Sequence, residues 1–275
     1  MMLASLINLL IHPLAQILLL ISLCLHAQLR ACCPASRSRA DWVLAASVLA
    51  FFTNILFCSV TDSLSPLRPY KLDLYAFALD RCLGSPAFLI GRLVHDSPVL
   101  FLTVSAAYAL LPIALLVSFW ATVTFRPVET RFAALTLSLN AFLLPLCYLL
   151  VPISGPVYAF PSFPVLPVGL VDWAAIPLTA APNGMPSGHF AGALLICWFT
   201  RHWLAGRVAS SVFLVLTTLA TLGLGEHYLI DLIAAIPYTV TILWLGSAVK
   251  LLEMKFLTTL ASKKLGNLAP PAMQA

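Results

Sequence analysis

Long apolar segments recur along this chain of 275 residues, and they restrict its fold more than any other feature. A helix of about 20 apolar residues can cross the roughly 30 Å hydrocarbon core of a bilayer. Only 9% of the residues are charged, whereas an ordinary soluble domain carries about 25%. A transmembrane β-barrel would show short segments of alternating polarity, and none are visible. The sequence therefore predicts an all-α, polytopic membrane helical bundle.

We expect about seven spans within one integral membrane domain, residues 1–275. The apolar start resembles a signal peptide, but its apolar run is too long, no Lys or Arg precedes it, and Arg30 lies inside the would-be cleavage site. We therefore expect two retained spans within residues 1–60 and the core spans within residues 98–248. The expected spans cover residues 4–28, 42–60, 98–123, 131–152, 187–205, 208–225 and 228–248.

Two segments are too polar to cross the bilayer. Residues 61–97 contain charges together with Gly84 and Pro86, so we expect two short interfacial helices there, with Phe77 and Leu83 on a shared apolar face. In the tail, residues 249–275, Leu and Phe alternate with Lys, which is typical of a basic amphipathic helix on a membrane surface.

The distribution of charge between alternate loops indicates the orientation. With the N-terminus outside, inner segments carry eleven positive and three negative charges, and outer segments carry four positive and seven negative. Because cytoplasmic loops are enriched in Lys and Arg, we expect residues 61–97 on the extracytoplasmic (periplasmic, extracellular or lumenal) side and the tail in the cytoplasm. The net charge of +5 thus reflects topology. The sequence contains no basic run with interleaved aromatic residues, so it does not indicate nucleic acid as a partner.

Two short polar motifs stand at the starts of apolar spans, where ionisable residues are costly and therefore candidates for function. "PSGH" ends at His189, and "EHYLID" contains His227 and Asp231. The span that starts at His189 runs inward and the next one returns, so both histidines should lie at the same depth on the extracytoplasmic side. Asp231 is four residues after His227, so it can accept the Nδ1–H of the imidazole and leave Nε2 free and more basic. An ordinary helix pair is the alternative.

The "PSGH" motif has the features of a helix start that binds an anion. Pro186 suits the entry to a helix and Ser187 is a good N-cap. Gly188 allows close approach to the backbone, and the free amides of the first turn attract a negative charge. His189 could then donate a proton to the anion or its leaving group. A capped helix start with an incidental histidine is the alternative.

Together these residues predict phosphoryl transfer at a lipid–water boundary through a phosphohistidine. His227 would attack phosphorus, His189 would protonate the leaving oxygen, and water or an alcohol would take the phosphoryl group. We expect neither a metal nor a cofactor. A non-haem metal enzyme is a less favoured alternative, because only His95 could add a ligand on this side. A transporter would show internal repeats or broken helices near mid-membrane, and neither is visible.

With "MPSGH" followed by "EHYLID", the chain resembles the type 2 phosphatidic acid phosphatase superfamily of membrane lipid phosphatases and phosphotransferases. The resemblance covers roughly residues 130–250. It implies a six-helix core, a metal-independent mechanism and, as partner, a membrane lipid bearing a phosphate or phosphodiester. It also implies that His189 assists the leaving group and that His227, with Asp231, is the nucleophile.

Two departures from the family pattern concern basic residues. The Ser-Arg pair that usually begins the third motif is replaced by Ala220 and Thr221, and the Lys and Arg-Pro of the first motif are missing from residues 148–160. "P-x2-G-P" at residues 152–156, with "LDLYAFALDRCLG" upstream, looks more like the inositol phosphorylceramide synthase branch, which transfers phosphorylated head groups between lipids. Four basic residues of the interfacial segment are our candidates for binding the phosphate; the alternative is that they balance nearby aspartates in a solvated region. These candidates are Arg68, Lys71, Arg81 and Arg92.

Overall fold

The computed structural model describes residues 65–169 and 173–266, with side chains described as far as residue 248. The spans expected at residues 4–28 and 42–60 lie outside this part. The longer described helices are α6 (Pro98–Phe125), α7 (Thr130–Leu150), α9 (Gly188–Thr200), α10 (Leu204–Gly223) and α11 (Leu229–Gly266). The shorter elements are β1 (Tyr70–Lys71), α4 (Asp73–Cys82), α5 (Pro86–His95), η2 (Pro127–Glu129), α8 (Pro156–Ala159) and β2 (Ile176–Pro177).

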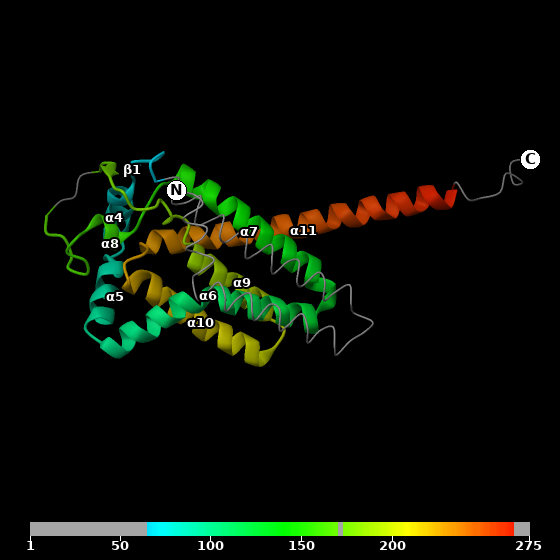
Figure 1. Ribbon diagram of the computed structural model, residues 1–275, viewed down its shortest axis with the longest axis horizontal. Coiled ribbons are helices and arrows are strands. Elements are labelled where there is room, and N and C mark those ends of the chain that lie inside the picture. The colour runs from blue at the N-terminus through cyan, green and yellow to red at the C-terminus, as the bar shows by residue number, and fades with distance from the viewer. Residues whose placement is uncertain (1–64, 170–172, 267–275) are drawn as a thin grey trace, which may run out of the picture.

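The expected all-α membrane bundle is confirmed for the described residues. Four helices are long and apolar enough to cross a membrane: α6, the η2–α7 unit, α10 and the first part of α11. The fifth expected span corresponds to α9, which is apolar but has only 13 residues. Helix α9 lies inside the bundle, because it packs against α6, α10 and α11 (Figure 1).

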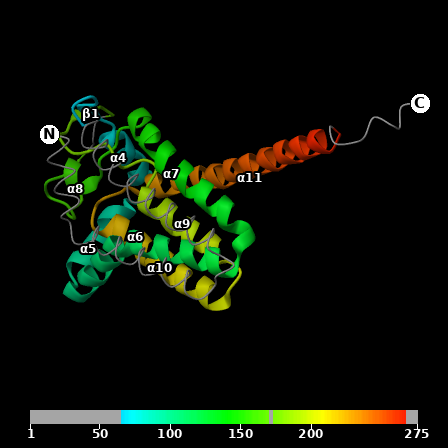
Figure 2. The same cartoon turned by 45° about the vertical axis from the view of Figure 1, so that its right-hand side comes forward.

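A cap of short elements covers one end of the bundle. Helices α4, α5 and α8 and the β1–β2 pair gather there in both views, and β1 pairs with β2 antiparallel (Figures 1 and 2). The expectation of two short helices within residues 61–97 is therefore confirmed by α4 and α5. The cap is fixed by an apolar cluster in which Phe77 and Phe88 pack with Leu222 of α10 and Tyr228.

The buried face of α4 differs from our expectation. Leu83 follows the last residue of the helix and is 52% exposed, because the chain turns away at Gly84, whose φ is +89°. The face that is buried contains Ala76 and Phe77 flanked by two carboxylates, Asp73 and Asp80.

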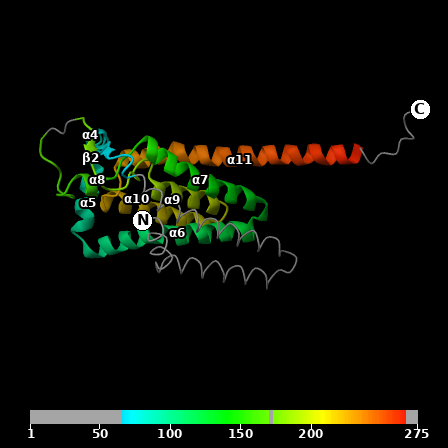
Figure 3. The same cartoon turned by 45° about the horizontal axis from the view of Figure 1, so that its top comes forward.

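The last span and the tail form one straight helix. Helix α11 runs from Leu229 to Gly266 without a break and extends beyond the other helices (Figure 3). After Gly246 the sequence contains no Gly or Pro before Gly266, so nothing in it ends the helix earlier. The location of the tail on a cytoplasmic membrane surface stays a prediction.

The opposite end of the bundle carries a compact ionic cluster. Glu129, beside the start of α7, lies 3.0 Å from Arg126, 3.1 Å from Arg201 and 3.3 Å from Nε2 of His202. Arg201 also lies over the Trp198 ring, 4.2 Å from its centroid. These contacts join the α6–α7 and α9–α10 connections.

Candidate active site

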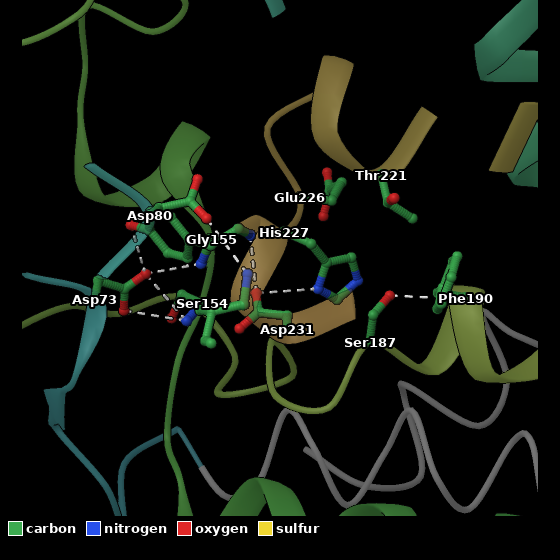
Figure 4. A network of polar contacts seen from close by, with 12 residues as sticks. Asp73, Asp80, Ser154, Gly155, Ser187, Phe190, Thr221, Glu226, His227 and Asp231 are labelled. Atoms are coloured by element: carbon green, nitrogen blue, oxygen red, sulfur yellow. Dashed lines mark hydrogen bonds and ion pairs between the residues drawn. The ribbon is translucent and has the colours of Figure 1, made fainter. Parts of the chain in front are cut away.

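The starts of α9 and α11 meet beneath the cap, and this brings the two polar motifs together. The amide of Ser187 donates to the carbonyl of Asp231 at 3.1 Å, which joins "PSGH" directly to "EHYLID". Figure 4 shows the His227 ring lying between Asp231 and Ser187. His189 lies two residues after Ser187, in the first turn of α9. The predicted juxtaposition of the motifs is therefore present in the fold.

His227 lies against Asp231 in the orientation expected from their spacing. Nδ1 of His227 is 3.5 Å from Oδ2 of Asp231, and the two side chains are almost completely buried. The distance exceeds that of a normal hydrogen bond, and Nδ1 has no other partner among the described residues. The same Oδ2 accepts the amide of Tyr228 at 2.9 Å, which holds the carboxylate in place. Nε2 is thus the imidazole nitrogen that is left for chemistry.

His189 is held by an aromatic partner from another helix. Its ring stacks on Tyr108 of α6, with centroids 3.6 Å apart and planes inclined by 15°. Stacking of this kind restricts rotation of the imidazole. The ring is therefore oriented by α6 as well as by its own place in the first turn of α9.

Ser187 is the N-cap of α9, as predicted. Its Oγ accepts the amide of Phe190 at 3.3 Å, and its side chain is completely buried. The next amides, those of Gly188 and His189, belong to the first turn, where an amide has no carbonyl partner within its own helix. Gly188 also has a packing role, because a Cβ there would lie 2.9 Å from Leu144 and from the Tyr148 hydroxyl of α7.

Asp73 connects the cap to the loop that carries His227. Its carboxylate accepts the amides of Ser154 at 3.1 Å and Gly155 at 2.8 Å and the hydroxyl of Tyr228 at 3.3 Å (Figure 4). Burial raises the pKa of this carboxyl to about 6, against the opposing effect of the two amides. Asp73 therefore joins the "P-x2-G-P" segment to Tyr228, the residue that follows the proposed nucleophile.

Asp80 acts at the start of α11. Its Oδ1 accepts the amide of Ile230 at 3.3 Å, so α4 supplies a capping acceptor to the helix that contains Asp231. Burial raises the pKa of the Asp80 carboxyl to about 6. Asp73, Asp80 and Lys71 are all completely buried. These three residues therefore do not lie in a solvated region.

Glu226 directly precedes His227 and is paired with the cap. The Tyr158 hydroxyl of α8 donates to its carboxylate at 3.2 Å. The backbone is also joined, since the amide of Val157 donates to the carbonyl of Gly225 at 2.9 Å. Gly155 has a φ of +123°, and a Cβ at this position would collide with the Glu226 carbonyl. The Gly-Pro pair of "P-x2-G-P" thus brings α8 against the His227 loop.

The four basic candidates belong to the cap or its edges. The Lys71 ammonium donates to the carbonyls of Arg68 and Leu178, and burial lowers its pKa, opposed by the charge of Asp73. Arg81 donates to the Gly169 carbonyl at 2.5 Å. Arg68 and Arg92 have exposed side chains. Among the described residues, none of the four forms an ion pair with Asp231 or Glu226.

The other histidine considered as a ligand has a packing role. Nδ1 of His95 is 2.8 Å from the Gly91 carbonyl in its own helix, and its ring packs against Phe101 and Phe163. In residues 65–169 and 173–266, no group of three or more His, Cys, Asp or Glu is arranged to hold a metal ion.

Sequence reasoning missed Asp73, Asp80, Tyr108 and the Glu226–Tyr158 pair as parts of this region. Asp73 and Asp80 did carry a signal, because residues seven apart share one face of a helix and the intervening positions of that face are apolar. The Tyr108–His189 and Tyr158–Glu226 contacts join residues 81 and 68 positions apart, so no local pattern could reveal them.

Comparison with known proteins gives one finding. A family model described as the PAP2 superfamily matches residues 76–245, a range that contains both polar motifs, α4 from its fourth residue and the first part of α11, as far as Leu245. No curated protein and no solved structure matches the chain significantly.

Proposed function

The chain belongs to the PAP2 superfamily, and from this membership and the geometry of the site we propose a membrane lipid phosphatase or phosphotransferase that works through a phosphohistidine. Membership supports an enzyme of the phosphoesterase class. The observation that carries the finer proposal is the direct link between the two motifs. The amide of Ser187, two residues before His189, donates to the carbonyl of Asp231, four residues after His227. The substrate is a membrane lipid bearing a phosphate or phosphodiester.

The first half-reaction forms a covalent intermediate. Nε2 of His227 attacks phosphorus, the bond from phosphorus to the leaving oxygen breaks in line, and His189 gives its proton to that oxygen. Asp231 faces Nδ1 and stabilises the positive charge that develops on the imidazole. The 3.5 Å separation is consistent with a pair that tightens when substrate is bound.

The second half-reaction returns the enzyme to its starting state. Water or an alcohol attacks phosphorus, the bond between phosphorus and Nε2 breaks, and His189 takes the proton of the attacking hydroxyl. The first-turn amides of α9, at Gly188 and His189, and the dipole of that helix would bind the phosphoryl oxygens in both steps. No metal ion or cofactor is part of this proposal.

The source of positive charge for the phosphate is the open part of the mechanism. We assign this positive charge to the interfacial basic residues, because they belong to the cap that covers the site or to the edges of that cap. Single alanine variants of all four test this assignment; if every variant keeps the turnover and substrate affinity of the wild type, the assignment is wrong. These residues are Arg68, Lys71, Arg81 and Arg92.

Head-group transfer of the inositol phosphorylceramide synthase type is the second candidate. The two sequence segments that resemble this branch are in contact in the structure, and this observation favours it. Asp73 of "LDLYAFALDRCLG" accepts the amides of Ser154 and Gly155 in "P-x2-G-P". Both candidates share the phosphohistidine step and differ in the acceptor.

One assay separates the two candidates. Purified enzyme is given a radiolabelled lipid phosphate or lipid phosphodiester, with and without a lipid alcohol. Release of a labelled water-soluble phosphate or phosphomonoester alone would indicate hydrolysis, and a new labelled lipid would indicate transfer. Absence of turnover on both substrate classes, under conditions where the protein stays folded, would contradict the proposed function.

The charge distribution of the sequence supports an extracytoplasmic active site and a cytoplasmic C-terminus. The ionic cluster of Arg126, Arg201 and Glu129 is at the end of the bundle away from the cap. Lys and Arg are enriched on the cytoplasmic side of membrane proteins. The cap with its four basic and several acidic residues would then face the periplasm, the lumen or the cell exterior.

A further inference from the structure

Glu226 is an ionisable residue beside His227 that the mechanism above does not use. It lies in the loop between α10 and α11, half-buried, and its carboxylate receives one hydroxyl donor, from Tyr158. Tyr158 is 44% exposed, so a ligand can approach the pair from the outer surface of α8. Burial and the neighbouring carboxylate raise the pKa of Tyr158 to about 12, so its hydroxyl keeps its proton at neutral pH.

The surroundings hold the backbone of Glu226 in a fixed place, and Tyr158 contacts its carboxylate. The Gly225 carbonyl accepts the Val157 amide at 2.9 Å, and Gly155 leaves room for the Glu226 carbonyl. Helix α8 therefore cannot move away from Glu226 without losing both contacts. Fixed polar groups of this kind are the ones that discriminate between ligands, because little ordering is needed when the ligand binds.

The carboxylate has hydrogen-bonding capacity that the described residues do not use. A carboxylate offers about four acceptor positions, and Tyr158 supplies a single hydrogen. No Lys or Arg of the described residues forms an ion pair with Glu226. Burial raises the pKa of the Glu226 carboxyl, opposed by the charge of His227. A partner with N–H or O–H donors would satisfy the remaining positions.

A negative charge beside His227 also affects which phosphate can bind. It repels the two charges of a phosphate monoester more strongly than the single charge of a phosphodiester. The Ser-Arg positions of the related motif are occupied by the uncharged Ala220 and Thr221, which are completely buried. The site therefore combines the carboxylate of Glu226 with uncharged residues at the two Ser-Arg positions near the end of α10.

We propose that Glu226, held by Tyr158, binds a hydroxyl or ammonium group on the head group of a lipid phosphodiester and so selects such a substrate over lipid phosphate monoesters. This inference rests on the proposed function, because it concerns the same site. Glu226 is then a specificity-determining residue, whereas His227, His189 and Asp231 carry out the transfer.

Three lipids test the proposal with the purified full-length enzyme. Phosphatidylglycerol and phosphatidylpropanol are both phosphodiesters with a three-carbon head group, and only the first carries hydroxyls there. Phosphatidic acid is the monoester. The wild type is expected to turn over phosphatidylglycerol with a kcat/KM about tenfold or more above that of phosphatidylpropanol, since a lost bond to a charged acceptor costs at least about this factor.

Glu226→Gln keeps the size of the side chain and an oxygen that can accept from Tyr158, but removes the charge. We expect its kcat/KM to fall about tenfold for phosphatidylglycerol and to rise for phosphatidic acid, because the repulsion of the dianion is gone. Asp96→Asn is the matched control, since it removes an exposed carboxylate from the same cap and should leave the ratio of the substrates unchanged.

Opposite changes on two substrates cannot come from a general loss of folding. A proportional fall on all three lipids in Glu226→Gln, or an unchanged ratio, would overturn the proposal. A wild type that does not distinguish phosphatidylglycerol from phosphatidylpropanol would overturn it as well. Failure of the proposed function itself would look different, because the wild type would then turn over none of the three lipids.

Discussion

Individual buried charges dominate the chemistry at the start of α11. Asp73, Asp80 and Asp231 are completely buried, and besides burial the charge of Asp231 raises the pKa of the Asp73 and Asp80 carboxyls. Their compensation comes from backbone amides, at Ser154 and Gly155 for Asp73 and at Ile230 for Asp80. Amides at a helix start suit a negative charge, and this makes several carboxylates tolerable in one place. The cap is therefore held to the His227 loop by polar contacts as well as by apolar packing.

The nucleophile assignment predicts the effect of removing one imidazole. His227→Ala should lower turnover by roughly ten-thousandfold or more, because it removes the proposed nucleophile. His202→Ala is the matched control, since this exposed histidine pairs with Glu129 in the ionic cluster. The measurement is turnover of labelled lipid, together with acid-labile label retained on the protein. Full activity of His227→Ala would refute the phosphohistidine mechanism.

The raised pKa of Asp80 predicts how stability depends on pH. Its carboxyl has a pKa of about 6 in the folded protein against 3.8 as the ordinary value, so the folded state binds the proton more tightly. The resulting stabilisation is complete below about pH 4 and is lost as the pH rises through about 6. Asp73 behaves in the same way. We therefore expect the thermal unfolding midpoint in detergent to decrease as the pH rises from about 4 to about 6.

Asp80→Asn tests this dependence, because the amide keeps an oxygen that can accept from Ile230. With one of the two titrating carboxyls removed, the variant should lose about half of the pH dependence. Asp73→Asn should remove a similar share. An unchanged slope in both variants would show that other groups control the stability in this range.

At the scale of the elements, a helix of four residues determines how the nucleophile loop is covered. Helix α8 touches the loop through Val157 and Gly225, through Tyr158 and Glu226, and at Gly155, where only hydrogen fits. The Asp73 carboxylate holds the amide of Gly155 from the other side. The loop before α11 is thus enclosed by segments that precede it by about 70 to 150 residues.

Gly155→Ala should displace α8 from the Glu226 carbonyl. Gly169→Ala is the matched control, since Gly169 also has a positive φ, +102°, but a Cβ there meets nothing within 4 Å. Both variants should lose about 1–2 kcal/mol of stability from backbone strain. Only Gly155→Ala should lose further stability and most of its turnover. Thermal unfolding and lipid turnover measure these effects, and equal behaviour of the two variants would contradict the role assigned to α8.

At the scale of the whole molecule, the bundle has two different ends. One carries the cap and the candidate site, and the other carries the cluster of Glu129, Arg126 and Arg201. Apolar helices of membrane-spanning length connect the two ends (Figure 1). The site would therefore meet lipid head groups at one surface of the membrane.

Cysteine labelling can establish which surface this is. In a variant without native cysteines, Arg92→Cys on the cap and Arg207→Cys at the start of α10 both introduce exposed thiols. A membrane-impermeant maleimide added to intact cells should label the first and not the second, and permeabilised cells should label both. The reverse pattern would place the site in the cytoplasm and would overturn the orientation derived from charge.

Sequence by itself determined the features that depend on local pattern. The apolar runs predicted α6, α7, α10 and α11, because the bilayer requires a fixed length of apolar helix. The cap of α9 at Ser187 and the facing of His227 and Asp231 followed from helix geometry. Even the meeting of the two motifs followed from the alternation of helix direction across a membrane.

Tertiary structure alone decided what surrounds those residues. Which aromatic ring stacks on His189, which acid caps α11 and which tyrosine pairs with Glu226 all depend on contacts between distant segments. The inward orientation of Asp73 and Asp80 is the clearest case, because their charge suggested a solvated face. Their amide partners become available only when α4, α8 and the start of α11 pack together, and only then is burial of those carboxylates favourable.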